Sequence, residues 1–224
     1  MTSNEQGRNA MARNRVLERA GSERLAKLVE AAGDATPVSG LTHNFYRYPA
    51  RFSPKLVRAA IEAFTEPGDL VLDPFVGGGT TLVEAMVLGR HAIGADISSL
   101  ATFVSEVKTT LYAEPELAAL RRWTDRLGKA IDIFAPIRAD SKYDDLGYLR
   151  HMDGIATWRL RKANNQALSS AKRLGAPRLQ AFARCAILRT AQWALDGRKK
   201  LPTINDFRDT LFKNAEAMIV GSRN

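Results

Sequence analysis

The stretch "LDPFVGGGTTLVEA", residues 72–85, constrains the fold of this chain more than any other feature. A short apolar run leads into three consecutive glycines, and a helical pattern begins directly after them. Glycines there allow positive φ and leave main-chain amides bare, so a ligand can lie against the N-terminus of the following helix. A second apolar run, "RHAIGADI", follows that helix after a short connection. The order strand, helix, strand predicts an α/β fold with a partial Rossmann-like parallel sheet.

Phosphate is the usual ligand of such a loop, but two phosphate motifs fail here. A P-loop requires a lysine after the glycines, and this chain has none at that point. The dinucleotide fingerprint, begun at Gly77, finds Gly79 but then has Leu82 where its third glycine belongs. Asp73, just before the loop, would place a carboxylate beside a bound pyrophosphate and repel it.

A cationic nucleoside fits the same residues better. S-adenosylmethionine carries an amino group and a sulfonium but no phosphate, and its ribose needs a hydrogen-bond acceptor. Such an acceptor is expected at the end of the second strand, about 20 residues further on. Asp96 lies there, 23 residues after Asp73. The alternative is a tight turn of an α/β sheet with an incidental aspartate.

The block "LDPFVGGGTTLVEA" resembles the D-P-F-x-G-x-G-T-T block of DNA methyltransferases that modify exocyclic amino groups of adenine or cytosine. The preceding "HNFYRYPARFSPKLVRAAIEAF" resembles the segment that these enzymes place before it, so the likeness covers roughly residues 41–110. It implies restriction-modification chemistry with S-adenosylmethionine as cofactor and DNA as substrate. It also implies that the ribose hydroxyls bind to Asp96, that the segment from His43 to Lys55 closes over the methionine end, and that the cofactor is lined by Asp73, Phe75, Gly77, Gly78, Gly79 and Thr80. Helix capping alone would explain Thr80, and sheet packing alone would explain Phe75.

The catalytic block of that family, [DNS]-P-P-[YF], is not found in this sequence, which contains no Pro-Pro. The nearest imitation is "DSKY", Asp140 to Tyr143, which lacks both prolines that stiffen the loop. We interpret it as an exposed loop, and we assign no catalytic residue.

Relatives of this kind can carry the catalytic block after a helical insertion that resembles residues 178–207. The sequence therefore predicts the cofactor-binding part of a split or truncated methyltransferase, completed by a second polypeptide or a missing segment. A catalytically inactive module that binds S-adenosylmethionine or DNA is the alternative. A small-molecule methyltransferase is disfavoured, because D-P-F-G-G-G-T-T is unlike the usual small-molecule version of this loop.

Outside the sheet the pattern is helical, and the excess positive charge is confined to the C-terminal part. Apolar spacing predicts helices at 12–33, 54–64, 99–109, 115–133, 157–174, 178–196 and 204–218. We divide the chain into an N-terminal helical segment, 1–40, a cofactor-binding α/β unit, 41–113, and a basic helical region, 114–224. These parts carry net charges of +1, −1 and +9. The basic region is either a solvated surface or a DNA contact. Trp158 and Trp193 are candidates for base stacking, with core packing the alternative for Trp193.

Other function classes find no support in the sequence. No apolar run is long enough for a membrane span, and the N-terminus lacks the apolar core of a secretory signal, so we expect a cytoplasmic protein. The single cysteine, Cys185, excludes an internal disulfide and fits a buried position. His43, His91 and His151 have no metal-ligand spacing.

Overall fold

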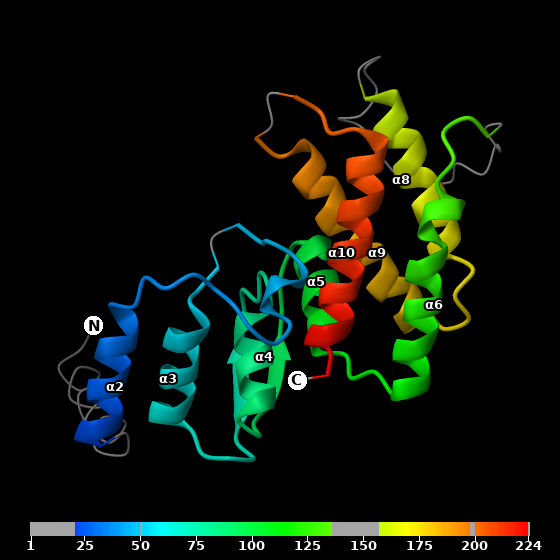
Figure 1. Cartoon of the computed structure of the whole chain (residues 1–224). Helices are drawn as coiled ribbons and strands as arrows, with labels where there is room; N and C mark the ends of the chain where they lie inside the picture. Colours follow the sequence, from blue (N-terminus) through cyan, green and yellow to red (C-terminus); the bar gives the residue numbers. More distant parts are fainter. Residues whose placement is uncertain (1–20, 50, 136–156, 198–199, 224) are drawn as a thin grey trace. The chain divides into compact units, whose positions relative to one another are not determined.

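The computed structural model describes residues 21–49, 51–135, 157–197 and 200–223 (Figure 1). The chain forms two compact units, one made of residues 1–43 with 48–109 and the other of 44–47 with 110–224. The first contains the sheet and is here called the α/β unit, and the second is called the helical unit. Four residues of the N-terminal half, 44–47, thus belong to the helical unit.

The α/β unit begins with two helices that pack on each other, α2 (Ser22–Ala32) and α3 (Pro54–Phe64). Gly33 follows the end of α2, as predicted, while residues 12–20 of the predicted helix lie outside the described residues. Ser53 is the N-cap of α3, and Pro54 is its first residue, where a missing N–H costs nothing. A short 3-10 turn, η1 (His43–Phe45), lies between the two helices.

The sheet consists of β1 (Leu70–Asp73) and β2 (His91–Gly94), which pair in parallel. Leu70 lies opposite His91, and Asp73 lies opposite Gly94. Helix α4 (Thr80–Val87) connects the strands, and α5 (Ser99–Thr109) follows β2. The predicted strand, helix, strand unit is therefore confirmed, although a larger Rossmann-like sheet is not part of the described structure.

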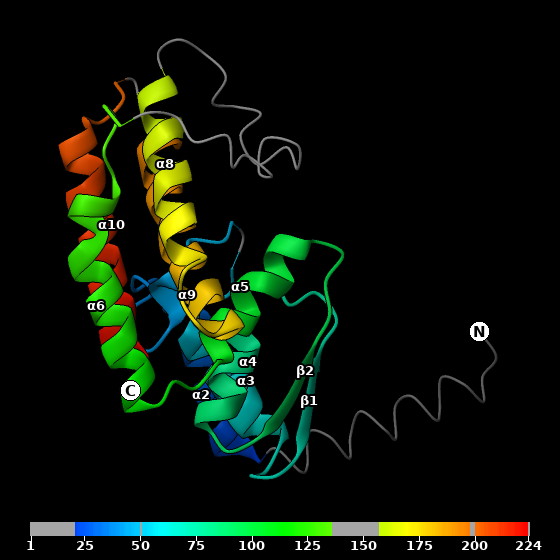
Figure 2. The ribbon, with the colours of Figure 1, turned by 90° about the vertical axis from the view of Figure 1, so that its right-hand side faces the viewer.

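Among the described residues of the α/β unit, helices cover only one face of this sheet. Val71 and Ala92 pack against a core of Val57, Ile61 and Ala85 from α3 and α4. Figure 2 shows these helices along one side of the two strands, and no described element of the unit lies over the other side. Alternate strand residues are consequently exposed there, namely Leu70, Leu72 and Ile93.

The helical unit is built from α6 (Glu114–Ala130), α8 (Trp158–Ala171), α9 (Pro177–Leu195) and α10 (Ile204–Gly221). These helices pack around a shared apolar core that includes Leu120, Phe182 and Leu211. Cys185 is fully buried in it, as expected. Among the described residues, no helix combines the length and the apolar character that crossing a membrane requires.

Candidate functional site

The glycine loop, residues 74–79, joins the end of β1 to the start of α4 and has a tightly wound backbone. The Val76 N–H donates to the Ala95 carbonyl at 2.9 Å, and the Gly79 N–H donates to the Val76 carbonyl at 2.8 Å. Gly77 and Gly79 have φ values of 48° and 75°. Side chains with a Cβ are strained in this left-handed region, so glycine is required by the path of the chain itself.

Asp96, which follows β2, lies against this loop. Its Oδ2 accepts a hydrogen bond from the Gly77 N–H at 2.9 Å, and its Oδ1 accepts from the Ser98 N–H at 2.9 Å. These backbone donors, joined by the Ile97 N–H, hold the pKa of the Asp96 carboxyl below its usual range. The group is therefore a carboxylate at neutral pH and keeps further lone pairs with which to accept ligand hydroxyls.

Asp73 is the last residue of β1, and Phe75 follows it in the glycine loop. The Asp73 Oδ1 accepts from the Phe75 N–H at 3.1 Å, which fixes a turn directly after β1. Phe75 itself is 84% exposed, so sheet packing within the described residues does not account for this aromatic side chain. Its ring is free to form one wall of a ligand site.

Thr80 is the first residue of α4 and is buried, whereas the N-cap is Gly79. Helix capping by the Thr80 side chain therefore does not describe this helix start. The carboxyl ends of the two parallel strands meet at one edge of the sheet. This edge holds all the predicted site residues, namely Asp73, Phe75, Gly77, Gly78, Gly79, Thr80 and Asp96.

Three residues that sequence reasoning missed hold the glycine loop in place. A Cβ on Gly78 would stand 2.9 Å from the Tyr48 Cβ, and a Cβ on Gly79 would stand 2.8 Å from the Ser105 Oγ. The buried Lys108 Nζ donates to the Gly78 carbonyl at 2.6 Å. Packing against Tyr48 and Ser105 therefore leaves no room for a side chain at Gly78 or Gly79, whether or not a ligand binds. A signal for two of these residues was present in the sequence. Ser105 and Lys108 are three residues apart and therefore lie on one face of α5, which could have indicated that this face packs on the loop.

An ionic cluster with a buried His43–Glu84 pair anchors the segment before α3 to α4. The His43 Nε2 and the Glu84 Oε1 are 2.7 Å apart, and the Arg58 Nε donates to the Glu84 Oε2 at 2.7 Å. The side chains of His43 and Glu84 are both 2% exposed. Burial raises the pKa of the Glu84 carboxyl, but the hydrogen bonds and charges of His43 and Arg58 outweigh it and leave that pKa lowered. The segment is thereby fixed beside the glycine loop, where the Tyr48 ring lies.

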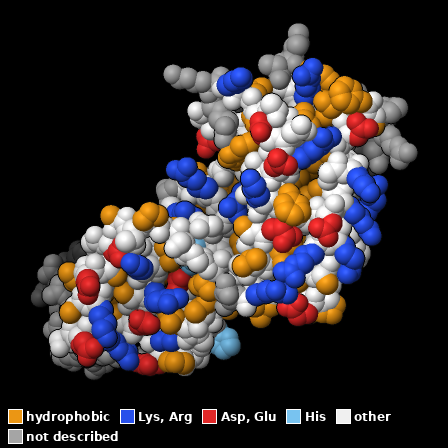
Figure 3. Space-filling view, in the orientation of Figure 1, with side chains coloured by type: hydrophobic (Ala, Val, Ile, Leu, Met, Phe, Trp, Pro, Cys, Tyr) orange, Lys and Arg blue, Asp and Glu red, His pale blue; other side chains and the backbone are white. Residues whose placement is uncertain are grey.

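The helical unit carries the basic surface predicted from the charge distribution. Lys and Arg side chains are spread over its visible face in Figure 3, with Asp and Glu among them. Trp158 is 44% exposed, and the Arg159 guanidinium lies 5.5 Å from its ring centre. Trp193 is half-buried, while Trp123 is buried and donates to the Ser170 hydroxyl.

Asp140 to Tyr143 lies outside the described residues. No cluster of three metal-ligating side chains occurs among the residues that the structure describes.

Comparison with known proteins adds three findings. A family model described as DNA methylase matches residues 21–102. The chain is 40% identical over 70 residues to the Type II methyltransferase M.MjaII of Methanocaldococcus jannaschii, which covers 31% of this chain and 13% of that protein. It is 38% identical over 105 residues to the Type II methyltransferase M.BsoBI of Geobacillus stearothermophilus, covering 46% and 20%.

The chain is also similar to a methyltransferase whose name refers to tRNA. The chain is 45% identical over 51 residues to a tRNA (guanine(10)-N2)-dimethyltransferase of Methanothermobacter thermautotrophicus, covering 22% of this chain and 15% of that protein. The chain therefore spans a fifth or less of the length of each of these three relatives. No solved structure matches it.

Proposed function

We propose that the chain supplies the S-adenosylmethionine-binding part of an enzyme that methylates an exocyclic amino group of DNA, because residues 21–102 match the family model described as DNA methylase. The observation that carries the proposal is the hydrogen bond from the Gly77 N–H to the Asp96 carboxylate. It brings the bare loop after β1 and the acid after β2 into one site, which is the arrangement that a nucleoside without phosphate requires.

Each predicted residue has a role in this proposal. The Asp96 carboxylate accepts the ribose hydroxyls, and the exposed Phe75 ring offers an apolar wall for the adenosine. The Asp73 carboxylate attracts the positively charged methionine end. Gly77, Gly78, Gly79 and Thr80 provide close main-chain approach at the N-terminus of α4.

The reaction also needs an acceptor loop for the target base, and the [DNS]-P-P-[YF] block is not found in this sequence. When bound, the cofactor would supply a methyl group on a sulfonium for transfer to the amino nitrogen of the base; the S–CH3 bond would break, the thioether S-adenosylhomocysteine would leave, and the nitrogen would lose a proton. Rate acceleration would come mainly from positioning. The base must leave the duplex to reach the methyl group, and a stiff acceptor loop with an aromatic clamp holds it there. We assign that loop to a second polypeptide or a further segment. The same partner would extend β1 and β2 into the larger Rossmann-like sheet. Such an enzyme works in the cytoplasm, where its substrates are found.

Calorimetric titration with S-adenosylmethionine tests the cofactor site. Asp96→Ala should weaken binding about 10- to 100-fold, because hydrogen bonds to a charged acceptor are lost. Asp132→Ala is the matched control, since the Asp132 Oδ1 also accepts a backbone N–H two residues on but lies outside the α/β unit. Absence of measurable heat for the wild-type chain would refute the proposal.

Methyl transfer is measured separately, with tritiated cofactor and duplex DNA or tRNA. The chain alone should be inactive, and it should gain activity on DNA with the polypeptide that carries the Pro-Pro block. Transfer to tRNA instead would assign the substrate class of the tRNA dimethyltransferase relatives. Cofactor binding without transfer under any combination would favour the inactive binding module, and activity of the isolated chain would refute the split enzyme.

A further inference from the structure

The turn that follows α6 is held by side chains from two other helices. Figures 1 and 2 show the end of α6 and the starts of α8 and α10 at the same end of the helical unit. The Lys162 Nζ of α8 donates to the carbonyls of Ile133 and Ala135 at 2.7 and 2.5 Å. The Arg208 Nε of α10 donates to a carbonyl at the start of the same turn at 3.0 Å. One ammonium therefore fixes the backbone on both sides of Phe134.

Two large aromatic side chains are exposed beside this ammonium. Phe134 is 90% exposed, and the Asp132 Oδ1 accepts from its N–H at 2.9 Å, so the turn presents the ring without burying it. Trp158 is 44% exposed and lies one helical turn before Lys162, on the same face of α8. Large aromatic side chains are usually buried, and rings held on a rigid backbone bind at a low cost in conformational entropy. The exposed rings therefore indicate a binding surface.

The charges around these two rings are mostly positive. Helix α8 contains Arg159, Arg161 and Lys162 and no Asp or Glu. Arg159 and Arg161 stand in its first turn, where the helix dipole favours acidic side chains, so the stability of α8 does not explain them. The Arg159 guanidinium lies 5.5 Å from the Trp158 ring centre, and Lys129 is exposed in the last turn of α6. The surface is therefore suited to a polyanion that also offers flat apolar groups.

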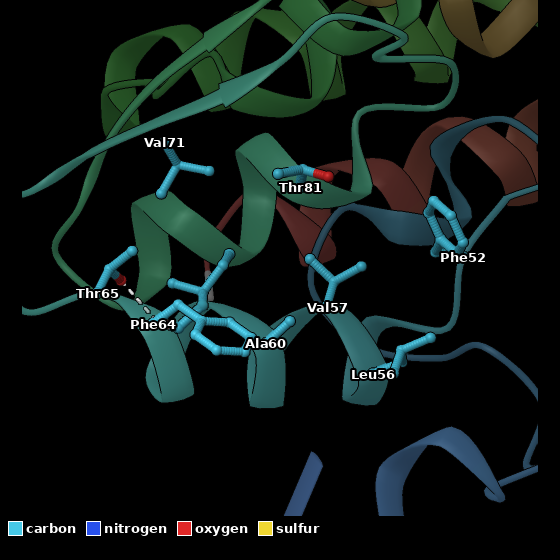
Figure 4. A pocket seen from close by; sticks show the side chains of 9 residues that line it. Phe52, Leu56, Val57, Ala60, Phe64, Thr65, Val71 and Thr81 are labelled. Atoms are coloured by element: carbon cyan, nitrogen blue, oxygen red, sulfur yellow. Dashed lines mark hydrogen bonds between the residues drawn. The ribbon is translucent and has the colours of Figure 1, made fainter. Parts of the chain in front are cut away.

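The α/β unit has an apolar surface of a different kind. Phe64 is 40% exposed and lines a groove between α3 and β1. Figure 4 shows Leu56, Val71 and Thr81 around the same groove. None of the described residues that line it is charged. An uncharged groove suits apolar side chains, whereas rings among cations suit bases that are joined by phosphates.

We propose that Phe134 and Trp158 form a stacking platform for unpaired nucleobases of a single-stranded nucleic acid, whose phosphates contact Arg159 and Lys129. This inference rests on the proposed function and specifies the form of the nucleic acid that the helical unit binds. A duplex buries the faces of its bases, so these rings can stack only on bases that have left the helix. Methyl transfer to an amino group of a base requires such an opened strand. The platform therefore binds the opened strand in preference to the intact duplex.

Fluorescence anisotropy with the full chain tests the platform, using labelled oligodeoxythymidylate, labelled oligouridylate and the duplex of oligodeoxythymidylate with oligodeoxyadenylate. At least one single strand should bind more tightly than the duplex, and the tighter one identifies the sugar that is bound. Phe134→Ala should weaken single-strand binding about 5- to 100-fold, which is the loss expected for one stacked base. Phe134→Trp should retain binding because it keeps a ring, whereas Phe134→Leu should lose as much as Phe134→Ala.

Trp158 and Arg159 provide two further readouts. Oligodeoxythymidylate should quench the tryptophan fluorescence of the wild-type chain by stacking, and Trp158→Phe should remove this quenching but still bind. Arg159→Gln should lower the slope of log affinity against log salt concentration by about 0.7, the value for one phosphate of a single strand. Phe64→Ala is the matched control, because it removes a partly exposed ring of the α/β unit and should change neither affinity nor quenching. Urea unfolding should show wild-type stability for Phe134→Ala, since that ring is exposed.

Three results would overturn the inference. Equal affinity for single strands and duplex would assign binding to the cations alone, full binding by Phe134→Leu would exclude stacking, and absence of binding would leave no nucleic-acid surface here. Titration with S-adenosylmethionine on the same samples separates the two proposals. A chain that binds the cofactor but does not prefer single strands refutes only the platform. A chain that prefers single strands but does not bind the cofactor refutes only the proposed function.

Discussion

Gly79 and Gly89 flank α4 with nearly equal φ values, 75° and 72°, but their surroundings differ. A Cβ on Gly79 would stand 3.0 Å from the Ser105 Cα, a backbone atom, whereas a Cβ on Gly89 would meet nothing within 4 Å. Gly89→Ala should therefore cost only the backbone strain, about 1–2 kcal/mol. Gly79→Ala should cost about 1–3 kcal/mol more, because the loop must also move off α5. Hydrogen exchange of the backbone amides of residues 80–87 measures the loss of stability of α4 in each of the two variants. Equal costs would contradict the contact with Ser105.

The Glu84 carboxyl should make stability depend on pH. Its folded pKa is lowered from the ordinary value of 4.5, so its contribution is fully present above that value. As pH falls through the lowered pKa, the unfolded state binds the proton more readily and the contribution is lost. Glu84→Gln should flatten this acid limb and destabilise the α/β unit at pH 7 by about 1–3 kcal/mol. Unfolding followed by circular dichroism from pH 3 to 7 tests this, with Glu62→Gln, on the exposed side of α3, as the control.

At this scale the sequence predicts the residues next to the strand ends but not those that support them. The order of the strands places Asp96 beside Gly77, because both follow parallel strands. Tyr48 could not be placed in the same way, since its contact with Gly78 depends on how a loop folds back across the sheet. Lys108 reads as a surface charge in a helix, and only the packing of α5 on the loop makes it a buried donor.

At the scale of elements, local signals suffice where a helix has a cap or a clear apolar period. The five helices predicted after residue 98 are confirmed to within a few residues at each end. Strand ends are less well marked. The apolar run at 90–97 suggested a longer strand than His91–Gly94, because the chain after Gly94 turns to bring Asp96 onto the glycine loop.

The start of α10 shows the clearest of these signals and offers a test. The Thr203 Oγ1 accepts from the Asp206 N–H at 3.1 Å, and the Asp206 Oδ2 accepts from the Thr203 N–H at 3.0 Å. Thr203→Ala removes the first bond and also the bond that the Thr203 hydroxyl donates to the Asp206 Oδ2, so it should destabilise the helical unit by about 1 kcal/mol. Thr203→Ser keeps the hydroxyl and should be nearly neutral. Tryptophan fluorescence during urea unfolding measures the stability of the helical unit, because all three tryptophans lie in residues 114–224. An equal loss in both variants would show that the threonine methyl group, not the cap, matters.

At the scale of the whole molecule, the order of residues along the chain does not give the order of packing. The sequence places residues 41–113 together, because the aromatic segment adjoins the cofactor-binding helix and strand. In the structure, residues 44–47 pack in the helical unit. The Phe45 ring lies edge-on to Phe182, 6.0 Å between centres, and Tyr112 meets the same ring at 5.4 Å. No local pattern announces a contact between residues more than 130 apart, so this step required the structure.

Because residues 44–47 belong to the helical unit, a substitution there should destabilise that unit. From residue order alone, the loss of stability would be expected in the α/β unit. Phe45 is 2% exposed, so Phe45→Ala leaves a cavity and should destabilise the helical unit by about 3–5 kcal/mol. Tryptophan fluorescence should report the loss, since it follows only that unit. Phe52→Ala is the matched control, because Phe52 is 67% exposed and lies in the α/β unit. If Phe45→Ala left the fluorescence transition unchanged but lowered hydrogen-exchange protection in α3 and α4, the segment would belong with the sheet instead. The expected result would mean that residues 44–47 are part of the core of the helical unit, although they stand between two segments of the α/β unit in the sequence.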